Sequence, residues 1–183
     1  MASYWEMLGE RVGYGLAAVV LGPVAALERR TRRTMRAAML DSFEDLRPLR
    51  LERRRGTIRR NVQLPTGAGA TSIDIDLDLH THKTKLTLRL ERLPSYVEAR
   101  IQKHGSEFRL TTTSLDDDAN HALVAMLTNG SLAGLDAIEI ALSPEEVVIH
   151  ITAPTTSEEW ATIRAGLVDM VSWLAARWPA SYR

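Results

Sequence analysis

Apolar and polar residues alternate strictly through the middle of the chain, from Ser72 to Glu91. The apolar positions are Ile73, Ile75, Leu77 and Leu79 on a first arm and Leu86, Leu88 and Leu90 on a second. A period of two residues over this length is typical of a β-strand with one buried face. The pattern therefore predicts a β-hairpin whose isoleucine and leucine side chains point into a core.

A two-residue turn at 82–83 would set the register of this hairpin. It would place Leu77 opposite Leu88 in the core. On the solvent-exposed face it would place Asp76 opposite Arg89, which is a favourable charge pair. A slip of one residue would turn every leucine to the other face, so we expect a single register.

A strongly basic stretch at residues 49–65 is expected to form a second hairpin. Gly56 supplies its turn, because glycine adopts turn conformations without steric cost. The segment Pro65–Ala70, PTGAGA, then forms a loop. Further along, Phe108–Thr113 is rich in β-branched residues and predicts a strand. Tyr96–Lys103 is expected to be a short helix or an irregular crossing.

A third hairpin is predicted around the turn Ser143–Glu146. Its apolar residues are Ile138, Ile140 and Leu142 on one strand and Val147, Ile149 and Ile151 on the other. This register places Glu139 opposite His150 on the other face. A Glu/His pair can act as an acid–base couple. No nucleophile or oxyanion donor accompanies it here, so a surface pair is the preferred interpretation.

Two helices are predicted in the second half of the chain. Residues 116–128 begin with three aspartates, which favour the positive end of a helix. The other helix covers 156–178 and opens with a capping box formed by Thr156 and Glu159. Its apolar stripe is Trp160, Ile163, Leu167, Met170, Val171, Leu174 and Trp178. We expect this stripe to cover a sheet.

An apolar run without a charged residue extends from Val12 to Leu27. As a helix it would be about 24 Å long, shorter than the roughly 30 Å hydrocarbon core of a membrane. Glycines and Pro23 weaken it as a soluble helix, although membrane helices tolerate both. A helical pattern then continues to Pro48, with Leu27, Met35, Ala38, Met39, Phe43 and Leu46 on one apolar side.

Three interpretations of this N-terminal arm compete. A secretory signal is disfavoured, because the basic cluster follows the apolar run instead of preceding it. Membrane association is favoured by aromatic residues at one end and arginines at the other. Packing against its own domain or against a second copy is the alternative. The candidate membrane or partner contacts are Trp5, Tyr14, Leu16, Val20, Leu21, Arg29, Arg30, Arg32 and Arg33.

The formal net charge of the 183 residues is zero, but the charge is divided unevenly. Residues 1–60 carry 13 arginines against 7 acidic residues, and residues 61–183 carry the opposite excess. The candidate anion contacts are Arg53, Arg54, Arg55, Arg59 and Arg60. A run of this kind can bind phosphate backbones or anionic lipid. Nucleic acid is less favoured, because no aromatic residues are interleaved to stack on bases.

The polar face of the central hairpin carries the candidate metal ligands of the segment Asp74–His82, which are Asp74, Asp76, Asp78, His80 and the nearby His82. Carboxylates two residues apart on a strand lie roughly 6.5 Å apart, which is wide for one ion. A solvated face with lysine and arginine counter-charges is the alternative. The chain contains no cysteine and no phosphate-binding, zinc-protease or nucleophile-elbow motif. We therefore expect no cofactor, and no feature of the sequence argues for a catalytic activity.

The stretch Phe108–Thr128, FRLTTTSLDDDANHALVAMLT, resembles part of a loosely defined set of uncharacterised bacterial proteins. The likeness extends over about residues 86–178, in which a strand, a helix, a hairpin and a long C-terminal helix follow one another. Many of those proteins have a membrane segment upstream. Their Gly-Asp-Pro-x-Phe-Asp signature is missing from this chain. The resemblance implies an accessory or regulatory module.

The sequence thus predicts an α+β fold: an antiparallel β-sheet made of hairpins and packed by two helices, with an N-terminal helical arm. We expect the arm at 1–48 and the α+β domain at 49–183. The favoured function is a non-catalytic interaction module in the cytoplasm, at the inner face of the membrane or docked on a protein partner or on itself. The alternatives are a nucleic-acid-associated protein and a small metal-dependent enzyme at Asp74–His82.

Overall fold

The computed structural model describes residues 4–43, 48–54, 56–66, 69–89, 93–136 and 138–178. Its strands are β1 (Pro48–Arg54), β2 (Thr57–Thr66), β3 (Gly69–Asp78), β4 (Lys83–Arg89), β5 (Ala99–His104), β6 (Glu107–Thr113), β7 (Glu139–Leu142) and β8 (Glu146–Thr152). Its helices are α1 (Tyr4–Ser42), α2 (Asp117–Asn129), the short 3₁₀ helix η1 (Ser131–Gly134) and α3 (Ser157–Arg177). The predicted α+β class is confirmed.

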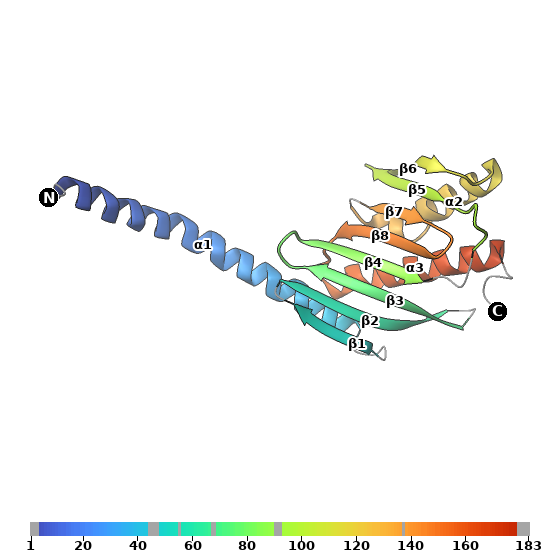
Figure 1. Cartoon of the computed structure of the whole chain (residues 1–183), viewed down its shortest axis with the longest axis horizontal. Helices are drawn as coiled ribbons and strands as arrows, with labels where there is room; N and C mark the ends of the chain where they lie inside the picture. Colours follow the sequence, from blue (N-terminus) through green and yellow to red (C-terminus); the bar gives the residue numbers. More distant parts are fainter. Residues whose placement is uncertain are drawn as a thin grey trace. The chain divides into compact units, whose positions relative to one another are not determined.

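The strands form one eight-stranded sheet in the order β1-β2-β3-β4-β8-β7-β5-β6, and every neighbouring pair is antiparallel (Figure 1). The first four strands follow one another as a meander. The chain then builds β5 and β6 at the far edge, and the β7–β8 hairpin fills the space between. Strand order therefore follows chain order only in the first half of the sheet.

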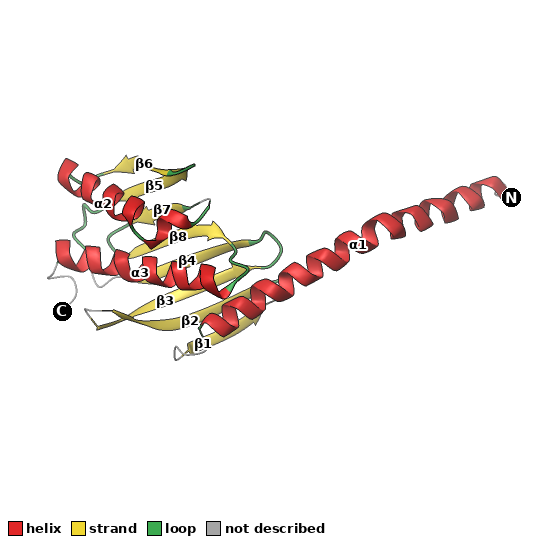
Figure 2. Ribbon diagram, turned by 180° about the vertical axis from the view of Figure 1, so that it is seen from behind, coloured by secondary structure: helices red, strands yellow, loops and turns green. Residues whose placement is uncertain are grey.

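Helices α2 and α3 lie on the same face of the sheet (Figure 2). Side chains from this helix-covered face form the core, because alternate residues of each strand point toward the helices. Its fully buried members include Ile75, Leu86, Ile149, Leu123 and Trp160. The other face, which we call the open face, carries the intervening polar residues.

The central hairpin has the predicted faces but not the predicted register. Leu77 lies opposite Thr84 instead of Leu88, and Asp76 lies opposite Lys85 instead of Arg89. The turn spans four residues, 79–82, rather than two. The turn begins directly after Asp78, because the Asp78 carboxylate accepts hydrogen bonds from the backbone N–H groups of His80, at 2.7 Å, and Thr81, at 3.2 Å.

Two further expectations are wrong in detail. Most of Pro65–Ala70 is not a loop, because Pro65 pairs with Ala70 and Thr66 with Gly69 at the ends of β2 and β3. Within 96–103, residues from Ala99 onward form β5 rather than a helix. Ala99 and Ile101 are buried while Arg100 is exposed, a period of two that is short but typical of a strand.

The helical pattern predicted to continue to Pro48 ends earlier, because α1 ends at Ser42 and Pro48 begins β1; Leu46 lies outside the described residues. Several other local predictions are confirmed. Gly56, with φ of 81°, forms the turn between β1 and β2. Glu139 lies opposite His150 in the β7–β8 pair. Asp116 caps α2 by accepting from the backbone N–H of Ala119, and α3 begins with the complete capping box of Thr156.

The chain divides into two compact units, Met1–Thr34 and Met35–Arg183. Helix α1 is continuous across this division, whereas the sequence placed the boundary at residue 48. The division falls earlier because the last turns of α1 belong to the core of the second unit. Met35, Met39 and Phe43 are each no more than 1% exposed.

Candidate functional site

The N-terminal part of α1 carries the predicted contact residues. The helix runs without interruption through Pro23. The side chains of Trp5, Tyr14, Leu16, Val20 and Leu21 lie outside the described part of the structure, although their backbone is helical. In the described part of the chain, no helix is both long enough and apolar enough to cross a membrane.

Two large apolar residues of the arm are exposed. Val24 is 59% exposed, and Leu27, which the sequence grouped with the buried side of the helix, is 66% exposed. Complete burial of such a side chain is worth about 1.5–3 kcal/mol relative to exposure. The arm therefore gains free energy from any apolar surface that covers this end of the run.

The arginines that follow this run differ in their availability. Arg29, Arg30 and Arg33 are exposed. Arg32 is half-buried and forms an ion pair with Glu28, one helical turn earlier. An i,i+4 pair of this kind stabilises the helix by only about 0.2–0.5 kcal/mol. The exposed cations at the end of the apolar run are thus Arg29, Arg30 and Arg33.

The C-terminal end of α1 is anchored in the second unit by aromatic and apolar packing. Met35, Ala38 and Met39 are buried there. Phe43 packs edge-on against Trp160 of α3, with 5.2 Å between the ring centroids. Such aromatic pairs contribute about 0.5–1.5 kcal/mol beyond their burial. The end of α1 is consequently part of the core of the domain.

Two arginines from other elements hold the last carbonyl groups of this helix. Arg60 of β2 donates to the carbonyl oxygens of Leu40, at 3.3 Å, and Phe43, at 2.7 Å. Arg164 of α3 donates to the carbonyl oxygen of Ser42 at 3.3 Å. These contacts satisfy acceptors that a helix end leaves without intrahelical partners and place cations at the negative end of its dipole.

The five arginines of the predicted anion-binding set lie in different environments. Arg60 is only 5% exposed, and its guanidinium donates to the end of α1. Arg59, on the opposite face of β2, forms an ion pair of 2.5 Å with Asp76. The side chains of Arg53 and Arg54 and the whole of Arg55 lie outside the described residues.

The acidic residues of β3 are held by neighbours rather than gathered around one point. Asp76 pairs with Arg59, and Asp74 pairs with Arg89 at 3.3 Å. The hydrogen bond from the backbone N–H of His80 lowers the pKa of Asp78 below its ordinary value of 3.8. Across the described ranges, no three His, Asp or Glu side chains are placed to share a metal ion.

A row of polar side chains crosses the open face from β2 to β6. Its members, in strand order, are Arg59, Asp76, Lys85, His150, Glu139, Gln102 and Arg109. Cations and anions largely alternate along it, so neighbouring strands present complementary charges. The sequence shows each hairpin but not the order in which hairpins pair, and the row could not be assembled without that order.

Comparison with known proteins gives little beyond this geometry. No protein-family model matches the chain, and no curated protein matches it. Among solved structures, the chain is similar to the crystal structure of the mycobacterial trehalose monomycolate transport factor A, TtfA. The TM-score is 0.47 and the identity 8%, and the alignment covers 81% of this chain and 94% of that chain.

Proposed function

We propose that this protein is a non-catalytic docking module whose helix α1 attaches it to an anionic membrane surface. The observation that supports this proposal most directly is the division of α1 into two kinds of surface. Its last turns are buried in the sheet domain, whereas Val24 and Leu27 are exposed beside three exposed arginines. The domain thus holds one end of the helix and leaves an apolar and basic end for an external surface.

The lengths involved favour a helix that lies in the interface rather than one that spans the bilayer. The charge-free run Val12–Leu27 is about 24 Å long as a helix, against roughly 30 Å for a hydrocarbon core. Helices lying in the interface bury an apolar face to a depth of roughly 5–10 Å while basic residues contact lipid headgroups. Apolar burial and electrostatic attraction then add.

The arginines supply the preference for anionic lipid. Each basic residue near such a surface contributes on the order of 1 kcal/mol. Arg29, Arg30 and Arg33 together therefore contribute about 3 kcal/mol, or on the order of a hundredfold in affinity. A second copy of α1 is the competing occupant of the apolar run, but its binding would not depend on the charge of the lipid.

Flotation with vesicles tests the proposal. The full-length chain is mixed with phosphatidylcholine vesicles that either contain or lack phosphatidylserine. We expect flotation with the anionic vesicles and a loss on the order of a hundredfold in affinity for the variant Arg29→Gln/Arg30→Gln/Arg33→Gln.

The matched control removes three exposed cations from the open face, in the variant Arg89→Gln/Arg100→Gln/Arg109→Gln. We expect it to float as the unaltered protein does, because the change in net charge is the same but its place is not. Equal flotation on neutral and anionic vesicles would contradict the electrostatic part of the proposal. Failure to float, together with self-association in light scattering, would assign the apolar run to a second copy.

A further inference from the structure

The open face is interrupted by a notch where β7 begins. Glu139 is the first residue of β7, and it pairs with Gln102 of β5 on one side and with His150 of β8 on the other. Strand β5 continues for two residues beyond this point, to His104, and β8 continues to Thr152. The preceding residue, Ile138, lies outside β7, although its carbonyl oxygen accepts a hydrogen bond of 2.9 Å from the backbone N–H of Lys103. Beyond Ile138, no strand in the described part of the chain lies between β5 and β8.

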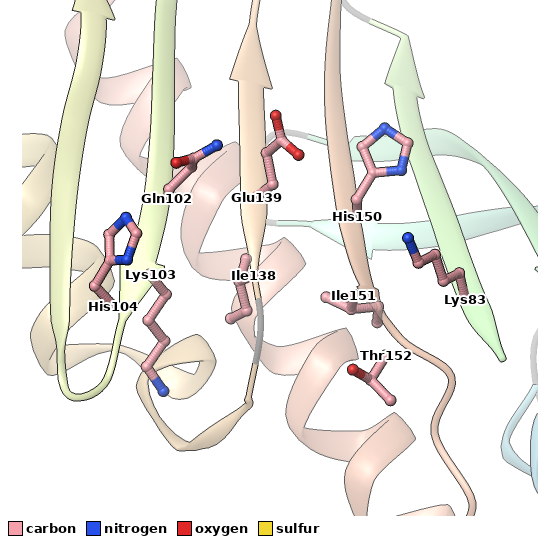
Figure 3. A pocket seen from close by; sticks show the side chains of 9 residues that line it. All are labelled: Lys83, Gln102, Lys103, His104, Ile138, Glu139, His150, Ile151 and Thr152. Carbon is pink, nitrogen blue, oxygen red and sulfur yellow. The ribbon is translucent and has the colours of Figure 1, made fainter. Parts of the chain in front are cut away.

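A pocket of about 380 Å³ occupies this notch (Figure 3). Ligand sites are typically about 300–1,000 Å³, so this volume suits a small molecule. The polar groups that line it come from four strands: Lys83, Gln102, Lys103, His104, Glu139, His150 and Thr152. The ammonium group of Lys103 is already held by the carbonyl oxygens of Ala133 and Leu135. Figure 3 shows His104 and Gln102 on one side, Lys83 and His150 on the other, and Glu139 between them. Ile138 and Ile151, both buried, add an apolar part to the lining.

Among the described residues, the charged side chains of this pocket form no ion pairs with one another. On the other half of the open face, Arg59 pairs with Asp76 and Arg89 with Asp74. At the pocket, the strand neighbour of Lys83 is Asp78, whose Oδ1 accepts from the turn backbone instead. Among the described residues, neither Lys83 nor Glu139 forms an ion pair or a side-chain hydrogen bond. The pocket therefore offers a cation and a carboxylate that are both available to a ligand.

The spacing of the strands sets the size of that ligand. Strands β5 and β8 lie on either side of β7, so they are roughly 10 Å apart, and β4 is one strand farther. A bare phosphate or carboxylate is too small to contact both sides. A ligand that uses the ammonium group of Lys83 and also reaches the groups on β5 must carry an anionic group at one end of an extended polar body.

We propose that this pocket binds a phosphorylated sugar of about hexose size. Lys83 and Thr152 are direct neighbours across β4 and β8, and they hold the phosphate as charge-assisted and neutral donors. Glu139, Gln102 and His104 hold the sugar hydroxyls, and the Glu139 carboxylate accepts hydrogen bonds from them. This site is separate from the arm, and the inference does not depend on the proposed membrane attachment.

Titration followed by backbone amide NMR tests the pocket in the full-length chain. The probes are glucose 6-phosphate, inorganic phosphate and glucose. We expect glucose 6-phosphate to shift the amide signals of Lys83, His104, Glu139, His150 and Thr152. It should bind at least about tenfold more tightly than either fragment, because only the whole molecule reaches both sides of the pocket.

Two lysines on one strand provide a matched pair of variants. Lys83→Gln should weaken glucose 6-phosphate binding by about tenfold or more and leave glucose binding unchanged. Lys85→Gln, two residues along on the same face but outside the pocket, should leave both unchanged. Both lysines are exposed, so neither change should alter the unfolding midpoint.

Several outcomes would overturn the proposal: no shifts at the pocket, equal losses in the two lysine variants, or glucose binding as tightly as its phosphate. A lipid headgroup that carries a phosphate and a polyol presents the same chemistry. Vesicles containing phosphatidylinositol, tested with the triple arginine variant of the arm, distinguish this source from the free sugar phosphate. Binding of the soluble probe by that variant also separates failure at the pocket from failure of the arm.

Discussion

Arg59 and Arg60 show at the residue scale how one position along a strand changes the role of a charge. Arg60 shares its face of β2 with the buried residues Ile58, Val62 and Leu64, and Arg59 lies on the open face. The sequence contains this signal, because alternate residues of a strand point to one side. The many neighbouring arginines made this alternation difficult to recognise.

Replacement of Arg60 should be costly because its hydrogen-bond acceptors would remain buried. Arg60→Ala leaves the carbonyl oxygens of Leu40 and Phe43 without this donor, and we expect a loss of about 2–3 kcal/mol in the free energy of unfolding. Arg59→Ala removes a surface ion pair and should cost about 0–1 kcal/mol. Chemical denaturation of the two variants makes the comparison. Equal losses would show that Arg60 does not anchor the helix.

Asp78 provides a pH-dependent contribution at the same scale. Its folded-state pKa is lowered by hydrogen bonds from the turn backbone. Its stabilising effect is therefore present above the ordinary value of 3.8 and is lost as the pH falls through the lower, folded value. Asp78→Asn keeps an acceptor but no charge, so its unfolding free energy should decline less between neutral and acidic pH. Parallel acid-denaturation curves for the two proteins would contradict this role.

At the scale of secondary-structure elements, the conformation of a turn sets the register of the two strands that it joins. Faces of strands, capping residues and the β7–β8 register follow from the sequence, since each depends on neighbouring residues. The register of β3 and β4 does not follow from alternation alone, because any shift by an even number of residues preserves the faces. Asp78 and the positive φ of His82 select the four-residue turn. An Asp immediately before a polar turn was the signal that could have found it.

Substitution of Gly56 tests whether the β1–β2 turn and the β3–β4 turn stabilise each other. A Cβ at Gly56 would lie 2.1 Å from the His80 ring, whereas a Cβ at Gly105 would meet nothing within 4 Å. Both glycines have positive φ, so Gly105→Ala should cost about 1–2 kcal/mol. Gly56→Ala should cost more, because the imidazole must also move. Thermal unfolding of both single variants and of Gly56→Ala/His80→Ala measures the excess; no recovery in the double variant would contradict this contact.

At the scale of the whole molecule, the pairing of β4 with β8 assembles the proposed pocket. This pairing brings Lys83 beside Thr152, nearly 70 residues later in the chain. No local pattern encodes it, since several orders of the same hairpins would bury the same apolar faces. The proposed sugar-phosphate pocket was therefore invisible in the sequence, although Glu139 and His150 were correctly paired.

The N-terminal arm can be recognised in the sequence, but the way in which its helix is anchored cannot. Its apolar run and its arginines are evident from composition, whereas its anchor is evident only in three dimensions. Phe43 directly follows α1, and it meets Arg60 of β2 and Arg164 of α3 at the end of the helix. We interpret this anchor as the means by which attachment of the arm is passed to the domain.

The measurement that tests this account most directly is the environment of single labelled positions in the presence of lipid. The chain has no cysteine, so Leu27→Cys and Thr112→Cys each carry one environment-sensitive fluorophore, on the arm and on the exposed surface of β6 respectively. We expect anionic vesicles to shift the emission at residue 27 to the blue and to leave residue 112 unchanged. A shift at both positions, or at residue 112 alone, would contradict attachment through the arm.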